Sequence, residues 1–241
     1  MMRTGGVLSL VLGVSLIACG GDDGGGATID APSGPDAQAM VTVSGVAETV
    51  QGTSRVPLAG AMIEAFDSGG GVALASTTSA SDGTYSLTLT TNGAPIDGYL
   101  KGTSATRIDT YLYPPRPLAA DRDSATMLLV NQQTLGLLGT LGGVSQDPAK
   151  GFIGVLVLDA AGTGVAGATV TVTPMGTARV IYVEGSLPNQ NATMTDASGT
   201  VFIANTNVGT VTVDAQQGAT DFFAHPVNAR AGVITTTALE P

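Results

Sequence analysis

The chain has 241 residues, of which 9 are Lys or Arg and 19 are Asp or Glu, so its formal net charge is −10 at pH 7. Nucleic-acid binding depends on clustered cations that neutralise phosphates, and a chain this poor in cations lacks them. The sequence contains one Cys and one His. This excludes a disulfide within the chain and any metal or catalytic site that needs two residues of either type.

Residues 1–18 have the layout of an export signal, with Arg3 followed by an apolar run from Val7 to Ala18. The run is shorter than the roughly 20 residues of a membrane-spanning helix, so we expect it to be cleaved. Leu16-Ile17-Ala18-Cys19 resembles the lipobox of bacterial lipoproteins. The resemblance implies that Cys19 is lipidated and that its acyl chains anchor the mature protein to a membrane. The alternative is an unmodified Cys19 in an ordinary secretory signal.

Residues 19–40 are rich in Gly, Asp, Pro and Ala and contain almost no large apolar side chain, which predicts a disordered tether. Gly20 follows the cysteine, where lipoproteins kept in the inner membrane carry Asp. The resemblance to lipoproteins therefore implies an outer-membrane protein, on either the periplasmic or the cell-surface side.

Residues 41–122 change to short runs of Val, Thr, Ile and Leu broken by Gly, Asp-Gly or Pro, which is the pattern of many short strands. The candidate strands are Val41–Val46, Ala61–Phe66 and Thr84–Leu89. In the last of these, period-two alternation predicts that Tyr85, Leu87 and Leu89 share one face.

Residues 151–241 repeat this order, with candidate strands at Gly154–Asp159, Ala168–Val172, Thr200–Ile203 and Gly209–Asp214. Gly60 matches Gly167, and Gly83 matches Gly199, so the two segments align as copies. The second copy is longer between these points, and we expect the extra residues to form a long loop from Pro174 to Asn191.

Two short motifs carry a more specific resemblance. Leu58-Ala59-Gly60-Ala61 followed by Ser81-Asp82-Gly83-Thr84-Tyr85 is similar to carboxypeptidase regulatory-like domains, and the second copy repeats the pattern with Val201 in place of the aromatic residue. This resemblance implies an all-β fold of two tandem seven-stranded, transthyretin-like (prealbumin-like) β-sandwiches. It implies no peptidase activity, because the motifs mark turns and core positions.

Residues 123–150 separate the two copies and lose the strand pattern. Leu135, Leu138 and Leu141 recur at three-residue spacing after Asn131, and Gly142 can end a helix. We expect a short helical connector between the sandwiches.

No residue pattern indicates catalysis. His225 is the only histidine, and no Gly-x-Ser-x-Gly motif accompanies it, so a buried structural role is favoured over a Ser-His-Asp triad. The carboxylates do not form an Asp-x-Asp-x-Asp-Gly calcium loop. We therefore expect no catalytic residue, no metal and no cofactor.

Two segments combine aromatic and cationic side chains that could bind a carbohydrate or a peptide. The candidate ligand-binding residues are Tyr99, Tyr111, Tyr113 and Arg116 in the first segment, and Arg179 and Tyr182 in the second. The alternative is that the tyrosines cap the sandwich edge and Pro114-Pro115 keeps that edge from pairing. The leading interpretation is a non-catalytic envelope scaffold or interaction module, and a carbohydrate- or peptide-binding surface lipoprotein is the second.

Overall fold

We analysed a computed structural model that describes residues 39–52 and 54–241. The described part has seventeen strands and one helix, which confirms the all-β expectation. Cys19, the predicted signal at 1–18 and nearly all of the predicted tether lie outside the described residues. Among the described helices, none has the length and apolar character needed to span a membrane.

The first half of the described chain contributes eight strands. They are β1 (Met40–Gln51), β2 (Ser54–Pro57), β3 (Met62–Asp67), β4 (Ala75–Thr78), β5 (Thr84–Thr90), β6 (Gly98–Thr103), β7 (Thr110–Tyr113) and β8 (Met127–Leu128). Strands β1, β2, β5 and β8 form a four-stranded sheet in which β1 pairs with each of the other three. Along β5 the alternation holds, since Tyr85, Leu87 and Leu89 are 5%, 3% and 2% exposed while the residues between them face solvent.

The second half contains the helix and nine strands. They are α1 (Gln132–Leu141), β9 (Gly151–Val157), β10 (Thr169–Thr173), β11 (Arg179–Glu184), β12 (Leu187–Asn189), β13 (Thr200–Thr206), β14 (Gly209–Gln217), β15 (Thr220–Asp221), β16 (His225–Ala229) and β17 (Ile234–Leu239). Strands β10, β14, β15 and β16 form a second four-stranded sheet in which β14 pairs with each of the other three. The expected count of seven strands per sandwich is too low, because strands of two to four residues such as β2 and β15 leave no clear periodicity.

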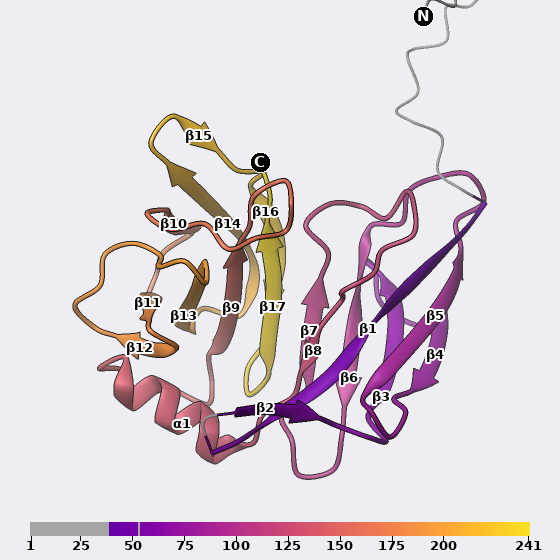
Figure 1. The fold of residues 1–241 in the computed structure, drawn as a ribbon, viewed down its shortest axis with the longest axis horizontal. Helices are drawn as coiled ribbons and strands as arrows, with labels where there is room; N and C mark the ends of the chain where they lie inside the picture. The colour runs from indigo at the N-terminus through magenta and orange to yellow at the C-terminus, as the bar shows by residue number, and fades with distance from the viewer. Residues whose placement is uncertain (1–38, 53) are drawn as a thin grey trace, which may run out of the picture. The chain divides into compact units, whose positions relative to one another are not determined.

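The remaining strands form one nine-stranded sheet in the order β12-β11-β13-β9-β17-β7-β6-β3-β4. Its central strand, β17, is parallel to β9 on one side and to β7 on the other (Figure 1). Because β7 belongs to the first half and β9 to the second, the halves share a sheet in addition to the helical connector.

The two four-stranded sheets cover opposite faces of this shared sheet. Leu112 on β7 lies opposite Thr236, and Thr236 lies opposite Gly154 on β9, so the three residues share one face, here called the Leu112 face. Leu112 packs on the core of the first half. Val155, the next residue on β9, points to the other face and belongs to the core of the second half. Each half therefore leaves one face of its own strands without a covering sheet in the described part.

The two copies repeat the same hydrogen bonds. The hydroxyl of Ser79 donates to the Leu58 carbonyl at 2.6 Å and accepts from the Ala61 N–H at 2.9 Å. The hydroxyl of Thr195 makes the equivalent bonds in the second copy, donating to Val165 at 2.6 Å and accepting from Ala168 at 2.9 Å. Each hydroxyl thereby provides a partner for one backbone carbonyl and one backbone N–H at this corner.

The expected helical connector is present as α1. The Asn131 side chain accepts a hydrogen bond from the Thr134 N–H at 2.8 Å, as an N-cap should, and the helix ends at Gly142. The expected long loop from Pro174 to Asn191 is wrong. Strands β11 and β12 form a hairpin there, because the apolar run Val180–Val183 pairs with β13 and becomes largely buried.

Candidate functional site

The structure brings three of the predicted ligand-binding residues together. Tyr99 on β6 lies with its ring centroid 5.5 Å from Tyr111 and 5.3 Å from Tyr113, both on β7. The ring of Phe66 on β3 stacks on Tyr99 at 5.4 Å. Tyr99 and Phe66 are directly paired across β6 and β3, so strand register alone places them side by side. Phe66, Tyr99 and Tyr111 are half-buried, and Tyr113 is 8% exposed.

Arg230 completes this group, although no sequence pattern pointed to it. Its guanidinium carbon lies 4.0 Å from the Tyr111 ring centroid and 4.9 Å from that of Tyr99. One guanidinium nitrogen donates to the Tyr113 hydroxyl at 3.1 Å and to the Asn228 carbonyl at 3.0 Å. Phe66, Tyr99, Tyr111, Tyr113 and Arg230 are called the aromatic cluster below. Since Arg230 follows β16, the cluster joins the two halves of the molecule.

Two cations lie beside the tyrosines of the aromatic cluster, Arg230 and Lys101. Burial raises the pKa of Tyr113, and the neighbouring Arg230 partly opposes that rise. At the edge of the cluster, the Lys101 ammonium is 5.9 Å from the Tyr111 ring centroid and 3.2 Å from an Asp109 carboxylate oxygen. The cluster therefore offers π-faces flanked by positive charge, an arrangement that suits sugar rings and other ligands with polar edges.

The other three predicted residues lie elsewhere. Arg116 is exposed, stacks on Phe223 with 4.5 Å between its guanidinium carbon and the ring centroid, and donates to the Pro241 carbonyl at 2.9 Å. Arg179 is exposed at the start of β11. Tyr182 is 7% exposed in the second-half core, and its hydroxyl accepts from the Val170 N–H at 3.0 Å. Its side chain therefore holds β11 against β10 instead of facing a ligand.

His225 is 5% exposed on β16, and its ring lies 6.2 Å from that of Tyr113. Neither ring nitrogen has a hydrogen-bond partner among the described residues. Burial lowers the pKa of His225, with a smaller opposing effect from Asp97. The imidazole is thus neutral near pH 7, and no Ser or Asp of the described chain is hydrogen-bonded to it as a catalytic relay requires.

Within the described ranges, the structure contains no group of three or more His, Cys, Asp or Glu side chains that could hold a metal ion. Several acidic residues instead accept hydrogen bonds within local turns. Asp159, for example, accepts from the N–H groups of Ala161 and Thr163, both at 2.9 Å.

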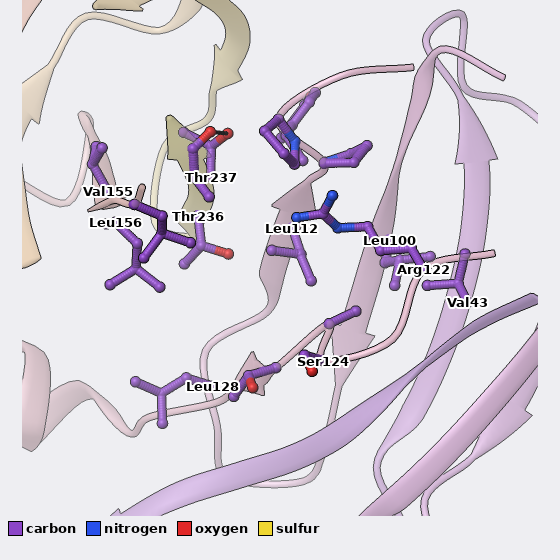
Figure 2. Close-up of a pocket in the computed structure, with 18 of the residues that line it drawn as sticks. Val43, Leu100, Leu112, Arg122, Ser124, Leu128, Val155, Leu156, Thr236 and Thr237 are labelled. Carbon is purple, nitrogen blue, oxygen red and sulfur yellow. Dashed lines mark hydrogen bonds between the residues drawn. The ribbon is translucent and has the colours of Figure 1, made fainter. Parts of the chain in front are cut away.

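A groove of about 190 Å³ lies on the Leu112 face, where the first-half covering sheet ends. Its floor is the central strand β17, with Thr236 and Ala238, and its sides include Leu112 and Leu156. Figure 2 shows Leu112, Leu156 and Thr236 around the opening, with Arg122 extending toward it from the first half. No sequence pattern predicted this groove, because its walls come from strands that are distant in the chain.

No family model matches the chain, and no curated protein matches it. Among solved structures, the chain is similar to the shaft pilin SpaA of Lactobacillus rhamnosus GG, with 12% identity over 84% of this chain and 98% of that chain and a TM-score of 0.27. It is also similar to GBS52, a minor pilin of Streptococcus agalactiae, with 12% identity over 83% of this chain and 94% of that chain and a TM-score of 0.28.

A third similar structure is the Bacillus anthracis TIE protein, with 9% identity, a TM-score of 0.26 and coverage of 82% of this chain. The chain spans only 33% of the TIE protein's length. At these TM-scores, the likenesses add nothing to what the strand order itself shows about the fold.

Proposed function

We propose that this chain is a non-catalytic, lipid-anchored protein of the cell envelope whose two β-sandwich halves act as one rigid scaffold. The observation that carries the proposal is the position of β17 between β9 and β7. All six residues of β17 pair with β9, and Ile234–Thr237 also pair with β7. A flexible linker would let the halves reorient, whereas a hydrogen-bonded strand with both neighbours fixes their relative position.

Side chains reinforce the connection made by β17. Arg122, in the first half, donates to the Glu240 carboxylate at 2.9 Å, and Arg230, in the second half, packs on Tyr111. Thr235 and Thr237 are buried at 1% and 2% exposure within the shared sheet. Separating the halves would expose these groups and break the parallel pairing, so the scaffold should open only when the whole described body unfolds.

Hydrogen exchange tests the scaffold. Under native conditions, amides of β6 in the first half and β13 in the second half should exchange with the same opening free energy, because both belong to the shared sheet. A control is β15, a two-residue exposed strand, which should exchange far faster. If β6 and β13 open with clearly different free energies, the halves are independent modules, and the rigid scaffold is refuted.

The anchoring part of the proposal rests on Leu16-Ile17-Ala18-Cys19 and is tested separately. Cells grown with an alkyne-labelled fatty acid should yield a labelled chain, and Cys19→Ser should lose both the label and the membrane association. A label that survives in Cys19→Ser would contradict anchoring at this residue. Protease treatment of intact cells then distinguishes a cell-surface chain, which is digested, from a periplasmic chain, which survives.

Carbohydrate binding is a second candidate, favoured by one observation. Phe66, Tyr99 and Tyr111 are partly exposed and adjoin one another on the face of β3, β6 and β7 that has no covering sheet in the described part. Adjoining aromatic rings of this kind can stack on sugar rings. A glycan array should show binding that Tyr99→Ala abolishes and that Phe223→Ala, at an exposed aromatic outside the cluster, leaves unchanged. An array without any bound glycan would rule this candidate out.

A further inference from the structure

The groove on the Leu112 face is a depression in the shared sheet itself. Strand register places Leu112, Thr236, Gly154 and Phe202 in one row across β7, β17, β9 and β13. The outer two residues of this row are large and the inner two are small, so the row is lowest over β17 and β9. Leu156, the next residue of β9 on the same face, is 38% exposed beside this depression.

The groove walls are mainly apolar. Two charged residues line the groove, Arg55 and Arg122, and both are cations; the described lining residues include no Asp or Glu. This stands out in a chain of net charge −10. Arg122 extends toward the strand that carries Leu112, as Figure 2 shows. Its single 2.9 Å bond to Glu240 uses one nitrogen of a group with five N–H donors, so donors remain for a ligand.

We propose that this groove binds an aliphatic carboxylate, with the hydrocarbon chain over Thr236 and Gly154 and the carboxylate on the Arg122 guanidinium. Apolar walls gain free energy from burying methylenes, and a guanidinium pairs with a carboxylate through two parallel hydrogen bonds. The volume of about 190 Å³ exceeds the roughly 150 Å³ of an apolar cavity known to admit benzene, so a medium-length chain fits. This activity is independent of the scaffold role and of the anchor at Cys19.

Gly154 provides a variant that fills the groove without straining the backbone. A Cβ at Gly154 would lie 3.4 Å from the Thr236 methyl and 4.0 Å from the Phe202 ring, both ordinary contacts. Gly154→Val should therefore fold and occupy the floor. Gly136→Ala, on an exposed helix position with nothing within 4 Å of the added Cβ, is the matched control outside the groove.

Titration calorimetry of the purified chain with decanoate, below its micelle concentration, tests the proposal. Decanoate should bind with a stoichiometry of one, and octanoate should bind more weakly, by up to about fourfold for each methylene removed. Gly154→Val should abolish binding, while Gly136→Ala should leave it unchanged. Arg122→Gln should weaken binding by about tenfold or more, and Glu240→Gln should strengthen it by freeing the Arg122 guanidinium.

Three results would overturn the proposal. The first is no binding of decanoate, and the second is binding that Gly154→Val does not affect. The third is equal binding of decyltrimethylammonium, which would show an apolar surface without preference for an anion. Sedimentation of the same chain would identify a different occupant if the chain dimerised and Gly154→Val made it monomeric, because the groove would then hold a second copy.

Discussion

Gly199→Ala should destabilise the folded chain more than most substitutions that add a single methyl group. Gly199 has a φ of +64°, which costs an L-residue about 1–2 kcal/mol. The added Cβ would also lie 2.1 Å from the Val157 carbonyl oxygen and 3.0 Å from the Val165 nitrogen. Both are backbone atoms and cannot rotate away. Relieving the clash must displace the Gly199 carbonyl, which accepts from the Val157 N–H at 2.8 Å. We therefore expect a loss of about 3–5 kcal/mol in the free energy of unfolding.

Gly162→Ala is the matched control, because Gly162 has a φ of +77° and nothing within 4 Å of the added Cβ. This variant should lower the free energy of unfolding only by the cost of placing an L-residue at positive φ, about 1–2 kcal/mol. Urea unfolding followed by circular dichroism measures both variants, with unchanged m-values confirming the same transition. Equal losses in the two variants would refute the assignment of the larger effect to the Val157 contact. Gly83→Ala should resemble Gly199→Ala, since its Cβ would lie 2.5 Å from the Ala47 carbonyl oxygen.

Three further variants can be measured in the same urea assay. Thr195→Val should cost about 1–3 kcal/mol, since it leaves the buried Ala168 N–H and Val165 carbonyl without their hydroxyl partner; no loss would contradict that role. Gly136→Ala should gain up to about 1 kcal/mol, because the added methyl raises helix propensity in open space; a loss would reveal an unseen contact. Burial holds the pKa of His225 in the folded chain below the ordinary value of about 6.5, so the unfolded chain binds the proton more tightly and stability should fall as pH drops below about 6.5. His225→Phe should remove this part of the pH dependence, and an unchanged pH profile would refute it.

Local chemistry was readable from the sequence. Alternation along β5 correctly predicted that Tyr85, Leu87 and Leu89 face the core. Asn131 and Gly142 correctly predicted the two ends of the helix. Both predictions depend only on residues that are close together in the chain. The match of Gly83 to Gly199 likewise located the repeat. Tyr99, Tyr111 and Tyr113 lie close together because β6 and β7 are consecutive strands that pair with each other. Tyr182 is buried in the second-half core, a position that its residue type alone does not reveal, because tyrosine occurs both in cores and at binding surfaces.

The sequence by itself therefore determined the all-β class, the duplication and the turns. Tertiary structure decided how the copies join. The pairing of Thr235 with Tyr111, and of Thr236 with Gly154, connects segments separated by dozens of residues, and no local propensity encodes which strands become neighbours. This strand pairing places Arg230 against Tyr111 and puts the small residues Thr236 and Gly154 on the groove floor. Side-chain sites built across a shared sheet exist only once long-range strand pairing has fixed the register, which is why residues such as Gly154 carry no signal in the sequence.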